Sequence, residues 1–102
     1  MSNEIIDGDA ELGGDGVLQG WCWKPLEPTE RPVVEILIDE RVVATSVASR
    51  FREDLRTRKI GDGYYGFMAT LSKSFAEAGG RFVVTARERR SGRCFWRHIR
   101  GG

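Results

Sequence analysis

The C-terminal part of the chain carries the residues best suited to binding a charged ligand. Residues 81–100 form two β-prone runs around Ser91-Gly92, a pattern that predicts a β-hairpin. If the turn holds two residues, four side chains share one face of this hairpin: Arg87, Arg89, Trp96 and His98. Guanidinium groups beside an indole suit an acidic polysaccharide, a phosphate-bearing polymer or an acidic protein surface.

Two alternatives are open for the same hairpin. A three-residue turn would shift the strand register by one residue and exchange the two faces. Independently, Trp96 could pack beneath a neighbouring loop while Arg87 and Arg89 keep an exposed edge strand soluble. The sequence favours neither the packed nor the binding interpretation of these side chains.

Trp21 and Trp23 form a second candidate for ligand binding. Residues 17–23 alternate with period two, which predicts a strand with both tryptophans on one face and Gly20 and Cys22 on the other. Exposed indoles at this spacing would stack on sugar rings. For at least one of the two we favour burial, because a small core needs the apolar area of an indole.

Residues 61–66 match the G-x-G-x-x-G pattern of dinucleotide-binding loops. Such a loop must follow a strand and open a helix, but here a helix-prone run precedes it and a strand-prone run follows. We therefore predict a turn in which glycines permit positive φ, and no cofactor. The structural residues of this turn are Gly61, Gly63 and Gly66, with Asp54 accepting hydrogen bonds from turn amides and Arg52 pairing nearby.

The remaining polar residues do not predict a catalytic or metal centre. His98 is the only histidine, and the pattern places neither a nucleophile nor an orienting carboxylate beside it. Four acidic residues between positions 7 and 15 alternate, but they lack the full loop and closing glutamate of a calcium site. We expect neither enzyme activity nor a bound metal, and we interpret residues 1–15 as a flexible acidic tail, with a short edge strand within it as the alternative.

Short β-prone runs separated by turn residues must position these side chains. We expect about six or seven strands and no repeated βαβ spacing, which predicts an all-β fold. The predicted architecture is a single antiparallel β-sandwich of immunoglobulin-like size over residues 16–102.

Two connections in this sandwich are predicted in more detail. Residues 32–48 form a second hairpin, and its Asp39-Glu40 turn departs from the Asp-Gly of a tight loop, so we expect a longer or bulged connection. Residues 51–59 are helix-prone, with Ser49 as a possible N-cap. We therefore expect one short helix after this hairpin.

Composition agrees with one folded domain, because 40% of the 102 residues are hydrophobic. The net charge of +1 argues against a nucleic-acid partner, yet the charge is divided along the chain. Residues 1–40 hold ten acidic and two basic side chains, and residues 41–102 hold fourteen basic and five acidic ones. The two regions either pair within the fold, which we favour, or dock on an acidic partner or a second copy.

The sequence also indicates a compartment. Cys22 and Cys94 are the only cysteines and have no metal-ligand spacing, so we expect them to act as small apolar residues. The start of the chain is acidic where a secretory signal would be basic and then apolar. No apolar run is long enough to span a bilayer. We expect a cytoplasmic protein without membrane insertion.

Four motifs occur in order: G-V-L-Q-G-W-C-W-x-P at residues 16–25, R-P-V-V-E-I-L-I-D at 31–39, F-R-E-D-L at 51–55 and G-D-G-Y-Y-G-F at 61–67. This set resembles small β-sandwich modules found beside or within bacterial glycosyltransferase and surface-polysaccharide proteins. The likeness covers residues 16–72, and it departs from the pattern at Cys22, where Ala is expected, and at Glu40, where Gly is expected. The resemblance implies an accessory or binding role and transfers no active site.

These observations lead to two functional expectations. The first is a non-catalytic interaction or assembly module that binds a protein partner or itself, associated with bacterial envelope or polysaccharide machinery. The alternative is a carbohydrate-binding domain for acidic glycans that uses Trp21 or Trp23, and Trp96, together with arginines.

Overall fold

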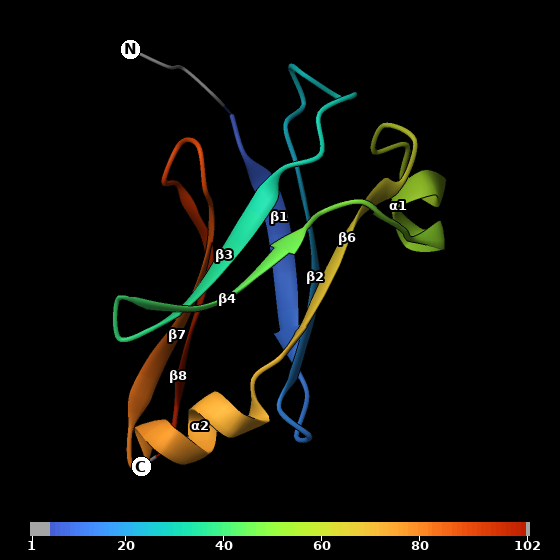
Figure 1. The fold of residues 1–102 in the computed structure, drawn as a ribbon. Helices are drawn as coiled ribbons and strands as arrows, with labels where there is room; N and C mark the ends of the chain where they lie inside the picture. The colour runs from blue at the N-terminus through green and yellow to red at the C-terminus, as the bar shows by residue number, and fades with distance from the viewer. Residues whose placement is uncertain (1–4, 102) are drawn as a thin grey trace.

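The computed structural model describes residues 5–101, in which eight strands form two antiparallel sheets (Figure 1). Sheet A has the order β1-β2-β6-β5, formed by Asp7–Leu12, Val17–Trp23, Tyr64–Thr70 and Arg50–Phe51. Sheet B has the order β4-β3-β7-β8, formed by Arg41–Val47, Val33–Ile38, Phe82–Glu88 and Cys94–Arg100. The predicted all-β sandwich is confirmed.

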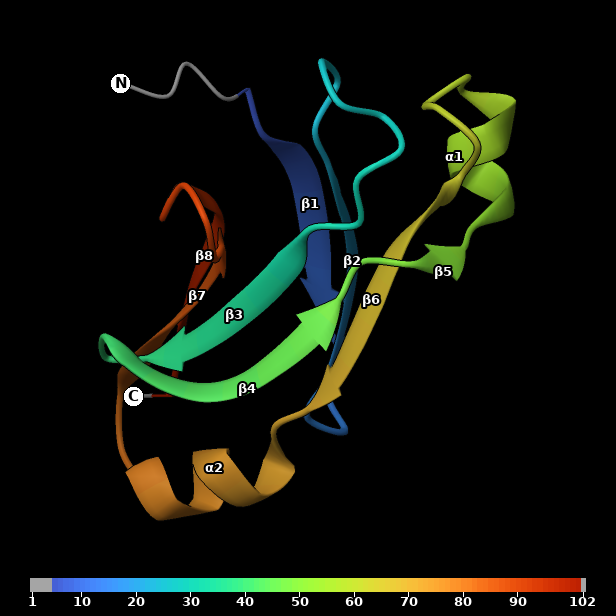
Figure 2. The ribbon, with the colours of Figure 1, turned by 45° about the horizontal axis from the view of Figure 1, so that its top comes forward.

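Two short helices lie in the connections, α1 (Glu53–Thr57) between β5 and β6, and α2 (Ser72–Ala78) between β6 and β7. Figure 2 shows α2 at one end of the sandwich and α1 beyond the β5 edge of sheet A. Within the described residues, no helix is long and apolar enough to cross a membrane.

The main core fills the space between the two sheets. Strict alternation directs Val34, Ile36 and Ile38 of β3 inward, as the sequence predicts, and leaves them at most 7% exposed. Across the core lie the buried inner residues of the other strands: Leu18, Cys22, Phe67, Val84 and Ala86. The sheets come closest where β1 lies beside β8 and β4 lies beside β6.

The prediction of a flexible tail over residues 1–15 is wrong for residues 7–12, where the alternative of a short edge strand is correct: they form β1, which pairs with Leu18 to Trp23 of β2 at the edge of sheet A. Residues 1–4 lie outside the described residues. Small side chains explain how this strand fits, since Gly8 and Ala10 face inward while the acidic residues between them face solvent. A Cβ at position 8 would lie 2.8 Å from the Phe95 ring, so the glycine leaves room for that ring.

The β3–β4 hairpin departs from the expected loop. Its turn is the tight two-residue one, because Ile38 pairs with Arg41 and both Asp39 and Glu40 have positive φ, 48° and 71°. The Asp39 carboxylate accepts a hydrogen bond from the Val83 amide at 3.0 Å, which ties the turn to β7. A bulge does occur, but inside the strands, next to Ile36 and Leu37.

A second, smaller core lies on the outer face of sheet A. The predicted helix is confirmed as α1 but is shorter than residues 51–59, and its N-cap is Arg52, not Ser49. Leu55 of α1 and Ile60 after it are buried against Trp21 and Tyr65. The helix therefore covers an indole that would otherwise face solvent.

We predict that Gly20→Ala destabilises the domain by about 1–3 kcal/mol, the usual cost of overpacking. A Cβ at position 20 would collide with the Asp9 carbonyl oxygen and lie 2.8 Å from Cζ of Phe67. Urea unfolding measures the change. Gly14→Ala is the matched control, since no atom lies within 4 Å of its added Cβ; equal stabilities of the two variants would contradict this packing.

Candidate functional site

The last hairpin has a register one residue away from the two-residue-turn prediction. Ala86 pairs with Trp96 and Val84 pairs with His98, and a bulge follows before Arg87 pairs with Cys94. The turn closes between Glu88 and Arg93, where the Glu88 amide donates to the Arg93 carbonyl at 2.9 Å. The exchange of faces foreseen for a longer turn has therefore occurred.

As a result, the predicted cationic aromatic patch does not form. Arg87 and Arg89 lie on the outer face of sheet B and contact the Glu35 carboxylate at 2.9 and 3.5 Å. Trp96 and His98 lie on the opposite face, where their rings stack at 5.8 Å. Trp96 is half-buried against the main core, and the predicted four-residue site is wrong.

Trp21 and Trp23 share the outer face of β2, as predicted, but neither offers an open ring. Trp21 is only 7% exposed, which confirms the prediction of burial for at least one of them. The guanidinium of Arg58 lies 5.6 Å from the Trp21 ring, and Trp23 packs against Tyr65 at 5.4 Å. A sugar ring therefore cannot stack flat on either indole without displacing these neighbours.

The glycine-rich segment forms the predicted turn. Gly61 and Gly63 have φ of 48° and 83°, and the chain continues into β6. Asp62, not Asp54, accepts the turn amide, from Tyr64 at 3.0 Å. The paired Arg31 guanidinium and this amide lower the pKa of Asp62 to about 2.

Asp54 serves a different purpose from the predicted one. Its carboxylate accepts two hydrogen bonds from Arg52, at 2.8 and 3.0 Å, and this pairing holds its pKa below the usual value. Arg52 in turn lies over Gly66, where a Cβ would be 3.1 Å from Cγ of Arg52. Gly66 thus lets the arginine side chain cross the sheet.

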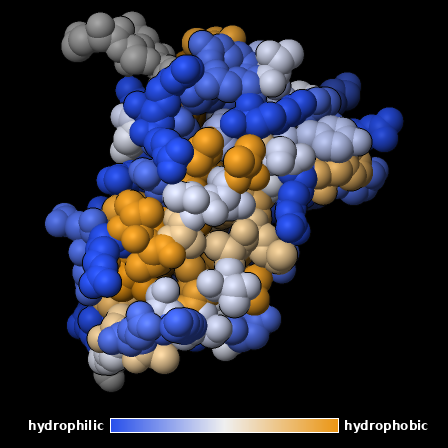
Figure 3. All heavy atoms as spheres, in the orientation of Figure 1, coloured by the Kyte–Doolittle hydropathy of each residue, from blue (hydrophilic) through white to orange (hydrophobic). Residues whose placement is uncertain are grey.

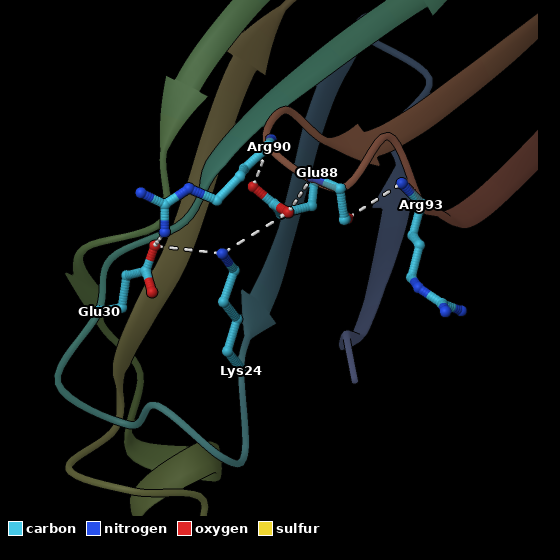
Figure 4. A network of polar contacts seen from close by, with 6 residues as sticks. Lys24, Glu30, Glu88, Arg90 and Arg93 are labelled. Carbon is cyan, nitrogen blue, oxygen red and sulfur yellow. Dashed lines mark hydrogen bonds and ion pairs between the residues drawn. The ribbon is translucent and has the colours of Figure 1, made fainter. Parts of the chain in front are cut away.

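A buried ion network at one end of the sandwich has no counterpart in the sequence predictions (Figure 4). Lys24 and Glu88 are both 2% exposed, and the Lys24 Nζ lies 3.7 Å from a Glu88 oxygen and 3.1 Å from Glu30. Arg90 also reaches Glu30, at 3.1 Å. The only feature of the sequence that could have indicated this ion network is a lone lysine within the acidic first forty residues.

Glu88 is ionised in this setting. Burial acts to raise the pKa of Glu88, but hydrogen bonds from the Ser91 and Arg90 amides, together with the charge of Lys24, outweigh it. The pKa therefore lies below its ordinary value of 4.5. A depressed folded-state pKa stabilises the fold above the unfolded pKa, and this contribution is lost as the pH falls through the folded pKa.

We predict that Glu88→Gln destabilises the domain by about 3 kcal/mol at pH 7. This is at the low end of the usual cost of breaking a buried ion pair, because Lys24 keeps its second partner, Glu30. The difference from the original chain should shrink as the pH falls from 4.5, since protonation removes the same charge. Urea unfolding across pH measures both effects. Exposed Glu53 supplies the control variant, Glu53→Gln; a Glu88→Gln deficit that stays constant down to pH 2 would disprove the assignment.

The remaining candidate ligands do not form a cluster. Within residues 5–101, no three His, Cys, Asp or Glu side chains are placed to hold one metal ion. Both cysteines are free; Cys94 is exposed, whereas burial raises the pKa of the Cys22 thiol to about 12. Cys22 thus behaves as the small apolar residue the sequence predicts, and Cys94 does not.

The outer face of sheet B carries exposed aliphatic side chains around Leu37, which is itself buried. Its cross-strand pairs include Val33 with Val47, Leu37 with Val42, and Val83 with Ile99. Val42, Val47 and Ile99 are 42%, 49% and 53% exposed. Figure 3 shows hydrophobic side chains gathered over β3 and β4. We call these six residues the aliphatic face.

Comparison with known proteins finds no matching family model, no matching curated protein and no matching solved structure.

Proposed function

We propose that this domain is a non-catalytic interaction module that associates with a second copy of itself through the aliphatic face. The apolar character of that face supports the proposal. An antiparallel sheet with one solvated face normally alternates apolar residues inward with polar residues outward. Here all four strands of sheet B also place an aliphatic residue outward, on either side of the central pair of Glu35 with Arg87, and exposed apolar patches are typical of interaction sites.

The charges around the aliphatic face favour a second copy as the partner. Asp39 and Glu40 follow the end of β3, whereas Arg89 donates its amide to the Val33 carbonyl at the start of β3. Acidic and basic groups therefore lie at opposite ends of the same strand. A two-fold axis through the middle of the face would set the acidic end of one copy over the basic end of the other.

The centre of the face is suited to burial as well. Glu35 is already paired with Arg87 and Arg89, so packing a second sheet on it would not leave a carboxylate without a partner. Arg97 lines the hollow beside the acidic turn, and Arg89 is 57% exposed at the other end. These groups would form the polar rim of the interface.

The proposal of a non-catalytic role rests on the positions of the carboxylates whose pKa is lowered. The carboxylates with lowered pKa are Glu30, Asp54, Asp62 and Glu88, and each is held in an ion pair within the fold. His98 stacks on Trp96. The likeness to modules of bacterial polysaccharide proteins supports an accessory task in such an assembly.

We predict that Val47→Glu weakens self-association at least about tenfold, because it buries an unpaired carboxylate in the interface. Sedimentation equilibrium over a range of concentrations measures the dissociation constant. Met68→Glu makes the same kind of change at a 39% exposed residue on the outer face of sheet A and should leave association unaltered. A chain that stays monomeric up to millimolar concentration would refute the proposal.

We also predict that charge reversal distinguishes the two-fold arrangement from other packings. Glu40→Arg and Arg89→Glu should each weaken association several-fold, and the double variant should recover most of the loss, because the two groups face each other across the axis. Sedimentation equilibrium at low salt measures this coupling. Additive losses in the double variant would rule out the two-fold arrangement.

A further inference from the structure

We propose that the outer face of sheet A binds a neutral oligosaccharide in a furrow that crosses the strands from β1 to β5. This site is independent of the self-association proposed above, since it lies on the other sheet and uses none of the aliphatic face. It shares Trp21, which lines the first hollow, with the predicted acidic-glycan site, and it differs from that site in its other residues and in the charge of its ligand.

The furrow consists of two adjoining hollows of about 130 and 260 Å³. Asp9 and Glu11 of β1 line the first hollow, and Arg50, Phe51 and Met68 line the second. Gln19 and Arg52 line both hollows and so join them. The combined space is of the size that small ligands occupy in protein pockets.

The register of sheet A explains why a furrow forms here. Trp21 pairs with Gly66, and Gly66 pairs with Arg50, so that the middle of this cross-strand row has no side chain. One row further along, Gln19 pairs with Met68 and Glu11 pairs with Gln19. The methylene groups of Arg52 lie in the space that the absent side chain at Gly66 leaves, and Gln19 and Met68 of the neighbouring row supply one wall of the furrow.

The polar groups of the furrow are partly fixed before a ligand arrives. The two hydrogen bonds from Arg52 to Asp54 hold the guanidinium in place, while Cγ and Cδ of Arg52 lie against Gly66. A preorganised arginine loses little conformational entropy when a ligand hydroxyl binds to it. Within the described residues, Asp9 and Glu11 enter no ion pair, and only Oδ1 of Asp9 accepts a hydrogen bond, from the Ala10 amide at 2.8 Å, so the other carboxylate oxygens can accept hydrogen bonds from a ligand.

The balance of donors and acceptors matches a polyhydroxylated ring. Each sugar hydroxyl both donates and accepts hydrogen bonds. The furrow offers carboxylate acceptors on β1 and guanidinium donors around β5. Between these groups lies the side-chain amide of Gln19, which can both donate and accept. Phe51 and Met68 are 41% and 39% exposed and give the C–H face of a sugar an apolar surface. Phe51 is steadied by Tyr64, whose ring lies 5.0 Å away.

The same charges discriminate against ionic ligands. An anionic glycan lying along the furrow would meet the carboxylates of Asp9 and Glu11, and a cationic peptide would meet the guanidiniums of Arg50 and Arg52. The charge of Arg52 is also partly neutralised by Asp54. A ligand without net charge avoids both repulsions and can still form hydrogen bonds with both kinds of group.

The test is a titration of the ¹⁵N-labelled chain, followed by NMR, with four neutral hexasaccharides (cellohexaose, maltohexaose, laminarihexaose and mannohexaose) and with hexagalacturonate. At least one neutral sugar should bind with a dissociation constant in the micromolar to millimolar range and shift the Gln19 side-chain amide and the Gly66 amide. Gln19→Ala should weaken that binding about tenfold, because it removes a group that donates and accepts at the centre of the furrow.

Thr70→Ala, at an exposed position on the same face but outside both hollows, is the matched control and should leave the affinity unchanged. Binding of hexagalacturonate alone, shifts confined to sheet B, or no binding of any of the four neutral sugars at 10 mM would each overturn the proposal. The dissociation constant for self-association, measured on the same samples, tests the proposed function independently of sugar binding, because Gln19 and the aliphatic face lie on different sheets.

Discussion

The buried carboxylate of Glu88 joins sheet A to sheet B and holds the turn of the last hairpin. It is buried together with the Lys24 ammonium, and it accepts hydrogen bonds from the amides of Arg90 and Ser91. The first contact joins the end of β2 in sheet A to sheet B, and the second shapes the turn after β7. Because the turn sets where β8 begins, this one carboxylate bears on the register of the last hairpin.

The register of the last hairpin decides which of its side chains are exposed to solvent. In the observed pairing, Trp96 and His98 are directed to the side of the core, while Arg87 and Arg89 gather around Glu35 on the outer face of sheet B. A shift of one residue would have combined these groups into a cationic aromatic surface. The last hairpin instead separates Trp96 and His98 from Arg87 and Arg89, and the two outer faces of the domain acquire different properties. Sheet B exposes aliphatic residues, and sheet A exposes a furrow with polar groups of both signs.

The divided charge of the chain is partly resolved inside the fold. Glu30 and Glu35, from the acidic first part, pair with Arg90, Arg87 and Arg89 from the basic second part. Asp9 and Glu11 do not join these pairs and line the furrow. Internal neutralisation, which the sequence favours, therefore applies to the residues near sheet B, and the acidic surface of β1 persists beside it.

Several features could be predicted because they depend on neighbours along the chain. Alternation in residues 33–38 is sufficient to direct Val34, Ile36 and Ile38 inward, and the glycines at 61 and 63 are sufficient to predict a turn with positive φ. The strand from Asp7 to Leu12 was harder to predict, because Gly8 and Ala10 are small, and only the fold shows that Phe95 packs at Gly8 and that Ala10 packs against the main core. The tight turn at Asp39 likewise depends on a hydrogen bond with distant Val83.

Local pattern alone thus determined that the chain forms a β-sandwich, which residues of most strands face the core, and that at least one of the indoles at positions 21 and 23 is buried. The register of β8, the burial of Lys24 and the hollows on the outer face of sheet A followed only from the assembled fold. The physical reason is the range of the interactions involved. Side-chain alternation is a property of one strand, whereas a register, a buried ion pair and a furrow each require segments that are far apart in sequence to meet.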